Sequence, residues 1–319
     1  MNYPTVGSLA KPFQRVPELG LFMILISTIG LITLANPFFA SVGSFEVILV
    51  TILYTGIIVI GQAMLMIVGE IDLSVGAVAS LGSVSTGLMM TKLSFPTPVA
   101  IVLGILVGAA IGFINGFITV KIQISAFITT LAMLFLARGI SYVLSGGDPV
   151  YPLPENAGVL SRTEILGLPS SVWIFLILFL ASDVWLRTTV SGRKLYLIGG
   201  NQVAARLSGI KVHKIKIILF TFTGALSAFA GILLMSKLER SDSITGLGWE
   251  LNVIAAVAVG GILLTGGGGS LTGAFLGLFF LQVVSQGLVM LGFDAFLLEA
   301  VTGTVMILAV LIVSRRKVN

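Results

Sequence analysis

The chain has 319 residues, of which 56% are hydrophobic and only 10% are charged, and its mean hydropathy is +1.11. Soluble domains carry roughly 25% charged residues, so this composition excludes a soluble globular protein and indicates an integral membrane protein. No cysteine is present, and the one histidine, His213, cannot form a His cluster, which makes thiol, zinc or Ser-His-Asp catalysis improbable. A net charge of +5 in so apolar a chain is more typical of membrane topology signals than of a nucleic-acid surface.

Charge-free apolar runs predict the transmembrane helices. A run of 43 uncharged residues, 251–293, would be about 65 Å long as one helix, about twice the hydrocarbon core, so we expect two spans broken at residues 266–269, which are four glycines. The first run has 17 residues before Asn36-Pro37, too long for a signal peptide, which predicts a retained helix. The predicted fold class is all-α, a polytopic membrane protein with about ten transmembrane helices. The other eight spans are residues 19–45, 47–69, 73–91, 93–120, 122–137, 165–182, 217–236 and 300–314.

The Lys and Arg residues predict the orientation of these spans. Ten spans place both termini on one side, which then holds 13 of the 18 basic residues and four acidic residues, a formal balance of +9, against −4 on the other side. We therefore expect both termini to be cytoplasmic. The 13 basic residues are Lys11, Arg15, Lys121, Arg187, Arg193, Lys194, Arg206, Lys211, Lys214, Lys216, Arg315, Arg316 and Lys317.

Two connections are longer than the rest. Residues 146–164 carry three acidic residues and three prolines, which predicts an ordered extracytoplasmic loop rather than a helix. Residues 187–216 carry seven basic residues and no acid, which predicts a cytoplasmic loop. Within it, Asn201 as N-cap and Gly209 at the end predict a short helix, with Gly199-Gly200 as a flexible lead-in. Such a helix suits a lever for a cytoplasmic partner, and the alternative is a basic helix lying on anionic lipid.

Small and charged residues within the apolar runs indicate internal packing. Gly104, Gly108, Gly112 and Gly116 lie on one helix face, which predicts close packing inside a bundle, with a pore-lining or dimer face as the alternative.

Three charged residues stand within or beside the predicted spans. Asp72 precedes the predicted third helix, where a carboxylate can cap free N–H groups, and a substrate or gating role is the alternative. Glu70 is expected in the cytoplasmic interface. Arg138 follows the fifth run, where it is expected to snorkel outward or to pair with an acid of another helix.

Four ordered motifs resemble the permease subunits of bacterial ABC importers of the ribose/galactose/xylose type, which include the autoinducer-2 permeases. They cover roughly residues 60 to 280. Three departures are Glu70 in place of the family's second glycine, Asn252 where aspartate is more common, and Val203 where the Glu-Ala-Ala coupling motif of classical importers has glutamate. The matching segments are residues 69–76 (Gly-Glu-Ile-Asp-Leu-Ser-Val-Gly), 126–131 with Arg138-Gly139, 192–210, and 250–256 with Gly260-Gly261 and the four glycines.

This resemblance implies a single transmembrane permease domain, residues 1–319, with residues 187–216 as its cytoplasmic coupling loop, in the bacterial inner membrane. The implied partners are cytoplasmic ABC ATPase subunits, an extracytoplasmic substrate-binding protein, a second permease subunit in a homodimer or heterodimer, and membrane lipid, with no nucleic acid. No cofactor is implied. The residues expected to couple to the ATPase are Asn201, Ala204, Ala205, Arg206, Ser208 and Gly209.

The chain contains no Gly-Lys dipeptide and so no Walker A phosphate loop, which predicts a transport subunit that is not itself an enzyme. We expect it to move a monosaccharide or related small polyol by alternating access, powered by a partner that hydrolyses ATP. The scarce polar residues near spans, Gln62, Asp72, Ser74 and Asn115, are the predicted translocation path or gate. The alternatives are an ion-coupled secondary transporter, which would use Glu70, Asp72 or Asp183, and, less favoured, an intramembrane enzyme.

Overall fold

The computed structural model describes residues 17–294, 300, 303 and 304. Within them, seven helices are long and apolar enough to cross a membrane, and Val75–Thr91 and Trp249–Val259 are shorter apolar helices. The prediction of an all-α polytopic membrane protein is confirmed. The predicted span 300–314 lies almost entirely outside the described residues, as do both termini, so ten spans and cytoplasmic termini stay predictions.

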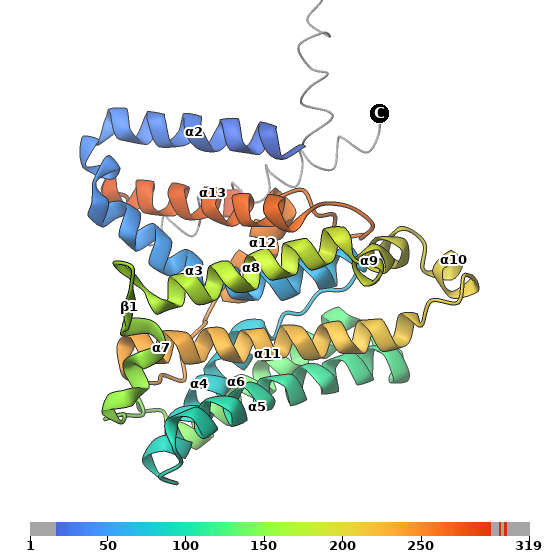
Figure 1. The fold of residues 1–319 in the computed structure, drawn as a ribbon, viewed down its shortest axis with the longest axis horizontal. Helices are drawn as coiled ribbons and strands as arrows, with labels where there is room; N and C mark the ends of the chain where they lie inside the picture. The colour runs from blue at the N-terminus through green and yellow to red at the C-terminus, as the bar shows by residue number, and fades with distance from the viewer. Residues whose placement is uncertain (1–16, 295–299, 301–302, 305–319) are drawn as a thin grey trace, which may run out of the picture. The chain divides into compact units, whose positions relative to one another are not determined.

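The elements follow one another along the chain with short connections (Figure 1). They are α2 (Pro17–Ala35), η2 (Pro37–Ala40), α3 (Val42–Ile67), α4 (Val75–Thr91), α5 (Thr97–Phe117), the π-helical turn η3 (Ile118–Ile122), α6 (Ala126–Ser145), η4 (Glu155–Gly158), α7 (Val159–Arg162), β1 (Glu164–Ile165), β2 (Leu168–Pro169), α8 (Ser170–Thr188), α9 (Val190–Gly200), α10 (Gln202–Leu207), α11 (Val212–Leu238), α12 (Trp249–Val259) and α13 (Leu271–Met290).

The described chain divides into two compact units. The first contains α2, the start of α3, Ala255–Leu263 and α13. Within it, α2 lies beside α13 (Figure 1). The Asn36 amide donates to the carbonyl oxygen of Met290 over 2.8 Å, and the rings of Phe45 and Phe279 pack edge to face. Asn36 also caps η2, which explains why α2 ends where the sequence places Asn36-Pro37.

The second unit, Leu53–Ile254 with Leu264–Gly268, is organised around α11, which packs against α4 and α5. The glycine face of α5 forms this contact. A Cβ atom at Gly108 would collide with the carbonyl of Gly224 on α11, and one at Gly112 would collide with the carbonyl of Phe220. The prediction of close packing within the chain is confirmed, since glycine lets the two backbones approach each other.

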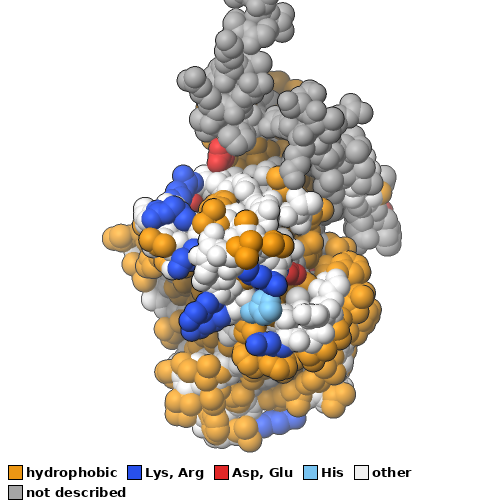
Figure 2. Space-filling model, turned by 90° about the vertical axis from the view of Figure 1, so that its right-hand side faces the viewer, with side chains coloured by type: hydrophobic (Ala, Val, Ile, Leu, Met, Phe, Trp, Pro, Cys, Tyr) orange, Lys and Arg blue, Asp and Glu red, His pale blue; other side chains and the backbone are white. Residues whose placement is uncertain are grey.

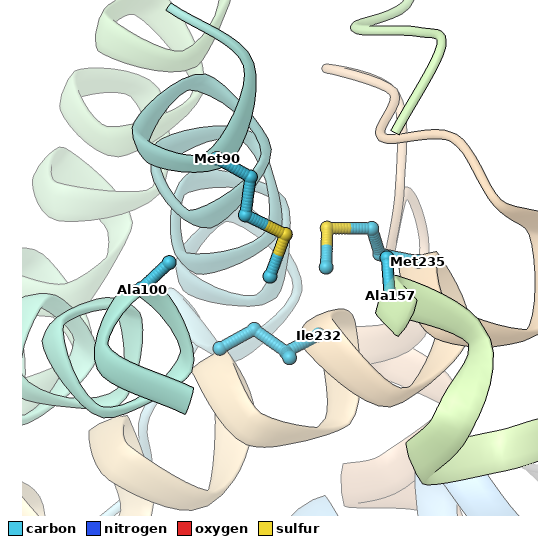
Figure 3. Close-up of a cluster of buried hydrophobic side chains, with 5 residues drawn as sticks. All are labelled: Met90, Ala100, Ala157, Ile232 and Met235. Atoms are coloured by element: carbon cyan, nitrogen blue, oxygen red, sulfur yellow. The ribbon is translucent and has the colours of Figure 1, made fainter. Parts of the chain in front are cut away.

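A cluster of buried apolar side chains joins four elements of this unit (Figure 3). Met90 of α4, Ala100 of α5, Ala157 of η4, and Ile232 and Met235 of α11 meet there, each at most 4% exposed. The cluster fixes the segment after α6 against the helices. The segment 146–164, predicted as an ordered loop without helix, contains η4 and α7 and ends at the start of β1, so the exclusion of helix there is wrong while the order is confirmed.

Several helix bounds differ from the predicted spans. Helix α6 runs to Ser145 and α8 runs to Thr188, because a charged residue such as Arg138 or Asp183 does not end a helix when its side chain finds a partner. Helix α12 ends at Val259, before the four glycines, and the connection to α13 has left-handed backbone at Gly261, Gly266, Gly267 and Gly269. The predicted break therefore exists and begins earlier than expected.

Candidate functional site

The polar centre of the second unit is Asp72, which lies in the non-helical segment between α3 and α4 and is 1% exposed. Its Oδ1 accepts hydrogen bonds from the backbone N–H of Ser74 over 2.8 Å and from the Ser74 hydroxyl over 2.6 Å. Ser74 is the N-cap residue of α4, so the carboxylate satisfies the backbone just before the helix. The capping role predicted for Asp72 is thereby confirmed.

Two further helices supply side chains to Asp72. The Asn115 amide of α5 donates to Ser74 Oγ over 2.9 Å and lies 3.4 Å from Asp72 Oδ2. The Gln62 carboxamide of α3, with its nitrogen toward the Asp72 carbonyl, bonds both backbone groups of Asp72 over 3.2 Å. The structure thus brings together all four residues predicted for the path or gate, here called the Asp72 network.

The network has a fifth member that the sequence reasoning missed. Thr130 of α6 accepts a hydrogen bond from the Leu73 N–H over 3.0 Å and donates to the Ala126 carbonyl. Its position within the family-like segment 126–131 is the signal that could have identified it. The side chains of Gln62, Asp72, Ser74, Asn115 and Thr130 are all at most 1% exposed, so the network is closed to solvent in this conformation.

Chemically, the Asp72 network offers hydrogen-bond donors and acceptors around one carboxylate, with no cation in an ion pair with Asp72 among the described residues. Asn115 Oδ1 is buried and finds no hydrogen-bond partner in the described part of the chain. Non-helical backbone inside a membrane protein persists only where protein or water satisfies its polar groups, and this network does that for residues 72–74. The residues that the structure describes contain no group of three or more side chains suited to a metal ion.

Arg138 lies inside α6 with its side chain 9% exposed, so the predicted snorkelling to an interface is wrong. Its guanidinium donates to the carbonyl oxygens of Ser243 and Thr245, each over 2.7 Å. Ser80 of α4 donates to the same Ser243 carbonyl over 2.8 Å. Arg138 therefore anchors the connection between α11 and α12, because α6 continues past it and aims the side chain inward.

The short helix predicted within residues 187–216 is confirmed as α10. The Asn201 side chain caps it by accepting from the Ala204 N–H over 2.9 Å, and Gly209 follows with φ +79°. Ala205 is buried, at 4% exposure, whereas Val203 and Leu207 are 68% and 85% exposed. The sequence reasoning did not identify Val203 and Leu207 as an outward apolar pair, because this requires knowing which face of α10 is buried.

Gly199 and Gly200 do not form the predicted flexible lead-in. They end α9, and a Cβ atom at Gly199 would collide with the Ile67 carbonyl at the end of α3. The N–H of Gly267, in the four-glycine turn, donates to that same carbonyl over 2.9 Å. Two glycine-containing segments therefore meet at the end of α3, where close backbone approach excludes larger residues.

An ion pair joins the segment of Asp72 to the loop. Lys216 Nζ of α11 lies 2.5 Å from Glu70 Oε1 and 3.3 Å from Gln202 Oε1 of α10. The Lys216 and Glu70 side chains are 8% and 15% exposed. Glu70, which departs from the family glycine, is therefore a structural partner of the loop rather than a freely solvated interfacial carboxylate.

The loop's own titratable groups leave it strongly basic. A tyrosine phenol is already neutral near pH 7, and burial raises the pKa of Tyr196 in α9 further above its ordinary value. Asp183 Oδ2 accepts from Arg187 Nε over 2.8 Å at the end of α8. Asp72, Glu70 and Asp183 thus have three different sets of partners and do not form one ion site.

Membrane-length helices around a broken helical segment and a buried polar network define a polytopic membrane protein, and this arrangement is typical of transporters. Comparison with known proteins agrees. Residues 44–311 match the family described as branched-chain amino acid transport system / permease component. The chain belongs to this family of ABC importer permeases. It is a transport subunit of the inner membrane and not an enzyme, since a partner subunit hydrolyses ATP.

Curated relatives match over most of their length. The chain is 36% identical to the ribose import permease protein RbsC of Escherichia coli (strain K12), over 92% of each chain. It is 30% identical to the L-arabinose ABC transporter permease protein AraH of Azospirillum brasilense, over 94% of this chain and 88% of that protein. It is 33% identical to the autoinducer 2 import system permease protein LsrC of Enterobacter sp. (strain 638), over 96% and 89%. No solved structure matches the chain significantly.

Proposed function

We propose that this chain forms the translocation path of an ABC importer for a monosaccharide or a related small polyol, and that it works by alternating access. The observation that carries the proposal is the Asp72 network, in which uncharged donors and acceptors outnumber the single carboxylate. An uncharged polyol needs hydrogen-bond partners rather than a salt bridge. The relatives named for ribose, L-arabinose and autoinducer 2 support this substrate class.

In this proposal the Asp72 network acts as the gate. Its side chains are closed to solvent here, so opening requires α3, α4, α5 and α6 to separate around residues 72–74. Three of these helices, α3, α5 and α6, each contribute a side chain that hydrogen-bonds to the segment, and a small helix movement would break several bonds together. Such a two-state element is what alternating access requires.

The coupling loop, residues 187–216, is proposed to receive the movement of a cytoplasmic ATPase through α10. The exposed pair Val203 and Leu207 would enter the ATPase surface, with Ala204, Arg206 and Ser208 around them and with Asn201 and Gly209 shaping the two ends of the helix. The link from Gln202 through Lys216 to Glu70 then reaches the residues next to Asp72. This gives a continuous physical route from α10 to the gate.

The complete transporter is proposed to contain ABC ATPase subunits, an extracytoplasmic binding protein and a second permease subunit, with residues 1–319 as one transmembrane domain and both termini cytoplasmic. Figure 1 shows α10 at one end of α11, with α7 and β1 near the other. This arrangement supports opposite sides of the membrane for the two loops. The ion-coupled alternative is less favoured because its three candidate carboxylates do not converge.

The substrate class is tested with the cognate extracytoplasmic protein. Calorimetric titration with a panel of pentoses, hexoses and autoinducer 2 should show tight binding of one member, and the permease should then import that solute. A binding protein that ignores the whole panel and takes up an amino acid instead would overturn the proposed substrate class.

A further inference from the structure

A groove of about 900 Å³ runs along α11 beside the end of α5, outside the Asp72 network. Its walls are apolar toward the middle of α11, where Phe113, Ile218, Phe222 and Ala225 line it. At the other end, its lining is basic and contains Lys121, Arg206, Lys211, His213 and Lys214. None of the 13 residues that line the groove is acidic.

The basic end of the groove carries uncompensated positive charge. Among the described residues, no ion pair joins Lys121, Arg206, Lys211 or Lys214 to a carboxylate, in contrast to Lys216, which pairs with Glu70. Helix α11 begins here, and its N-cap residue makes no side-chain cap hydrogen bond, so the positive end of the helix dipole adds to the field. Figure 2 shows Lys and Arg side chains gathered around the histidine on this face.

The length of the groove indicates the kind of ligand. From Lys211 to Ala225 the helix rises about 21 Å, so the groove follows α11 from its basic start well into the span. A free anion would use only the basic end, and a soluble protein could not reach the apolar end within the hydrocarbon core. A molecule with a phosphate headgroup and an acyl chain matches both ends at once.

We propose that this groove is a binding site for one anionic phospholipid, with its phosphate held by Lys121, Lys211 and Lys214 and an acyl chain lying against Phe113 and Phe222. The proposal rests on the transmembrane course of α11 and does not depend on which solute is carried. Because the site borders α10, an anionic lipid there would also stabilise the position of the coupling loop.

The test is native mass spectrometry of the full-length permease, released from membranes containing phosphatidylglycerol and phosphatidylethanolamine. We expect wild-type protein to retain phosphatidylglycerol, and the double variant Lys211→Gln/Lys214→Gln to retain about tenfold less. Phe222→Ser, at an exposed position in the apolar part, should weaken retention without any change of charge. Lys237→Gln, an exposed lysine at the far end of α11, is the matched control and should retain the wild-type amount.

Excess inorganic phosphate in the same experiment separates a lipid from a free anion. Persistence of bound phosphatidylglycerol in phosphate supports the proposal, whereas full displacement together with normal retention by Phe222→Ser would reduce the groove to an anion site and overturn it. Equal retention by the double variant and Lys237→Gln would also overturn it. If the double variant retains the wild-type amount of lipid but no longer binds the ATPase, the proposal is also overturned, because the basic residues then belong to the contact with the protein partner.

Discussion

The ion pair between Glu70 and Lys216 should contribute measurably to folding because both side chains are largely buried. Removing one partner of a buried pair typically costs about 3–5 kcal/mol, since the other charge is left unpaired. The Glu70 and Lys216 side chains are 15% and 8% exposed, and Lys216 has a second contact with Gln202. The cost should therefore lie near the lower end of this range. We therefore expect Glu70→Gln or Lys216→Met alone to lower the free energy of unfolding by about 3 kcal/mol.

The double variant Glu70→Gln/Lys216→Met removes both charges and should cost much less than the sum of the single changes. A coupling free energy of about 2 kcal/mol is expected from the double-mutant cycle. The assay is unfolding in mixed detergent and dodecyl sulfate micelles, followed by the fluorescence of the native tryptophans. In parallel, uptake per ATP hydrolysed should fall in the single variants, because the pair links α10 to the segment of Asp72.

The pair of Asp183 and Arg187 provides the matched control. It joins residues four apart in one helix, and the Arg187 side chain is 53% exposed, so neutralising it should cost no more than about 0.5 kcal/mol. If the unfolding costs of Glu70→Gln and Lys216→Met add up to the cost of the double variant within about 0.5 kcal/mol, the reasoning is refuted. Unchanged coupling of uptake to ATP hydrolysis in the single variants would refute the proposed route through the loop.

Three other substitutions test the helix packing, the Asp72 network and the docking role of α10. Gly108→Ala should lower the yield of folded protein severalfold in size-exclusion chromatography, because its methyl group meets the α11 backbone, while Gly139→Ala, with open space around it, should not; equal yields would contradict the close packing. Asp72→Ala should lower the melting temperature and stop uptake, whereas Asp72→Asn keeps an acceptor for Ser74 and should melt near wild type; equal melting of the two variants would contradict the contribution of the Ser74 hydrogen bond. Leu207→Glu should abolish co-purification of the ATPase while the permease stays folded, and retained co-purification would show that α10 is not the docking helix.

Hydropathy and glycine spacing were sufficient to predict much of the fold. The membrane class, the first helix and the glycine contact of α5 follow from patterns that depend on chain length and side-chain size alone. Helix ends were less predictable where charges intervene. Arg138 looked like the end of a span because hydropathy cannot show that the carbonyls of Ser243 and Thr245, more than 100 residues away, accept hydrogen bonds from its guanidinium.

The candidate site, like the fold, was predicted only in part. Scarcity of polar residues was enough to select Gln62, Asp72, Ser74 and Asn115, since a polar side chain in an apolar span needs a partner. The partner of Glu70 could not be predicted, because it comes from a helix 146 residues further along the chain. The outward apolar pair of α10 also required the structure, which shows Ala205 to be the buried residue of that helix.

The most direct test of the central claim measures solute uptake into membrane vesicles that contain the permease, its ATPase and the substrate-binding protein. We predict that uptake stops when ATP is removed or the ATPase is omitted, even though the proton and sodium gradients are maintained. Continued uptake driven by those gradients alone would contradict the account, because the Asp72 network and the coupling loop would then serve an ion-coupled transporter.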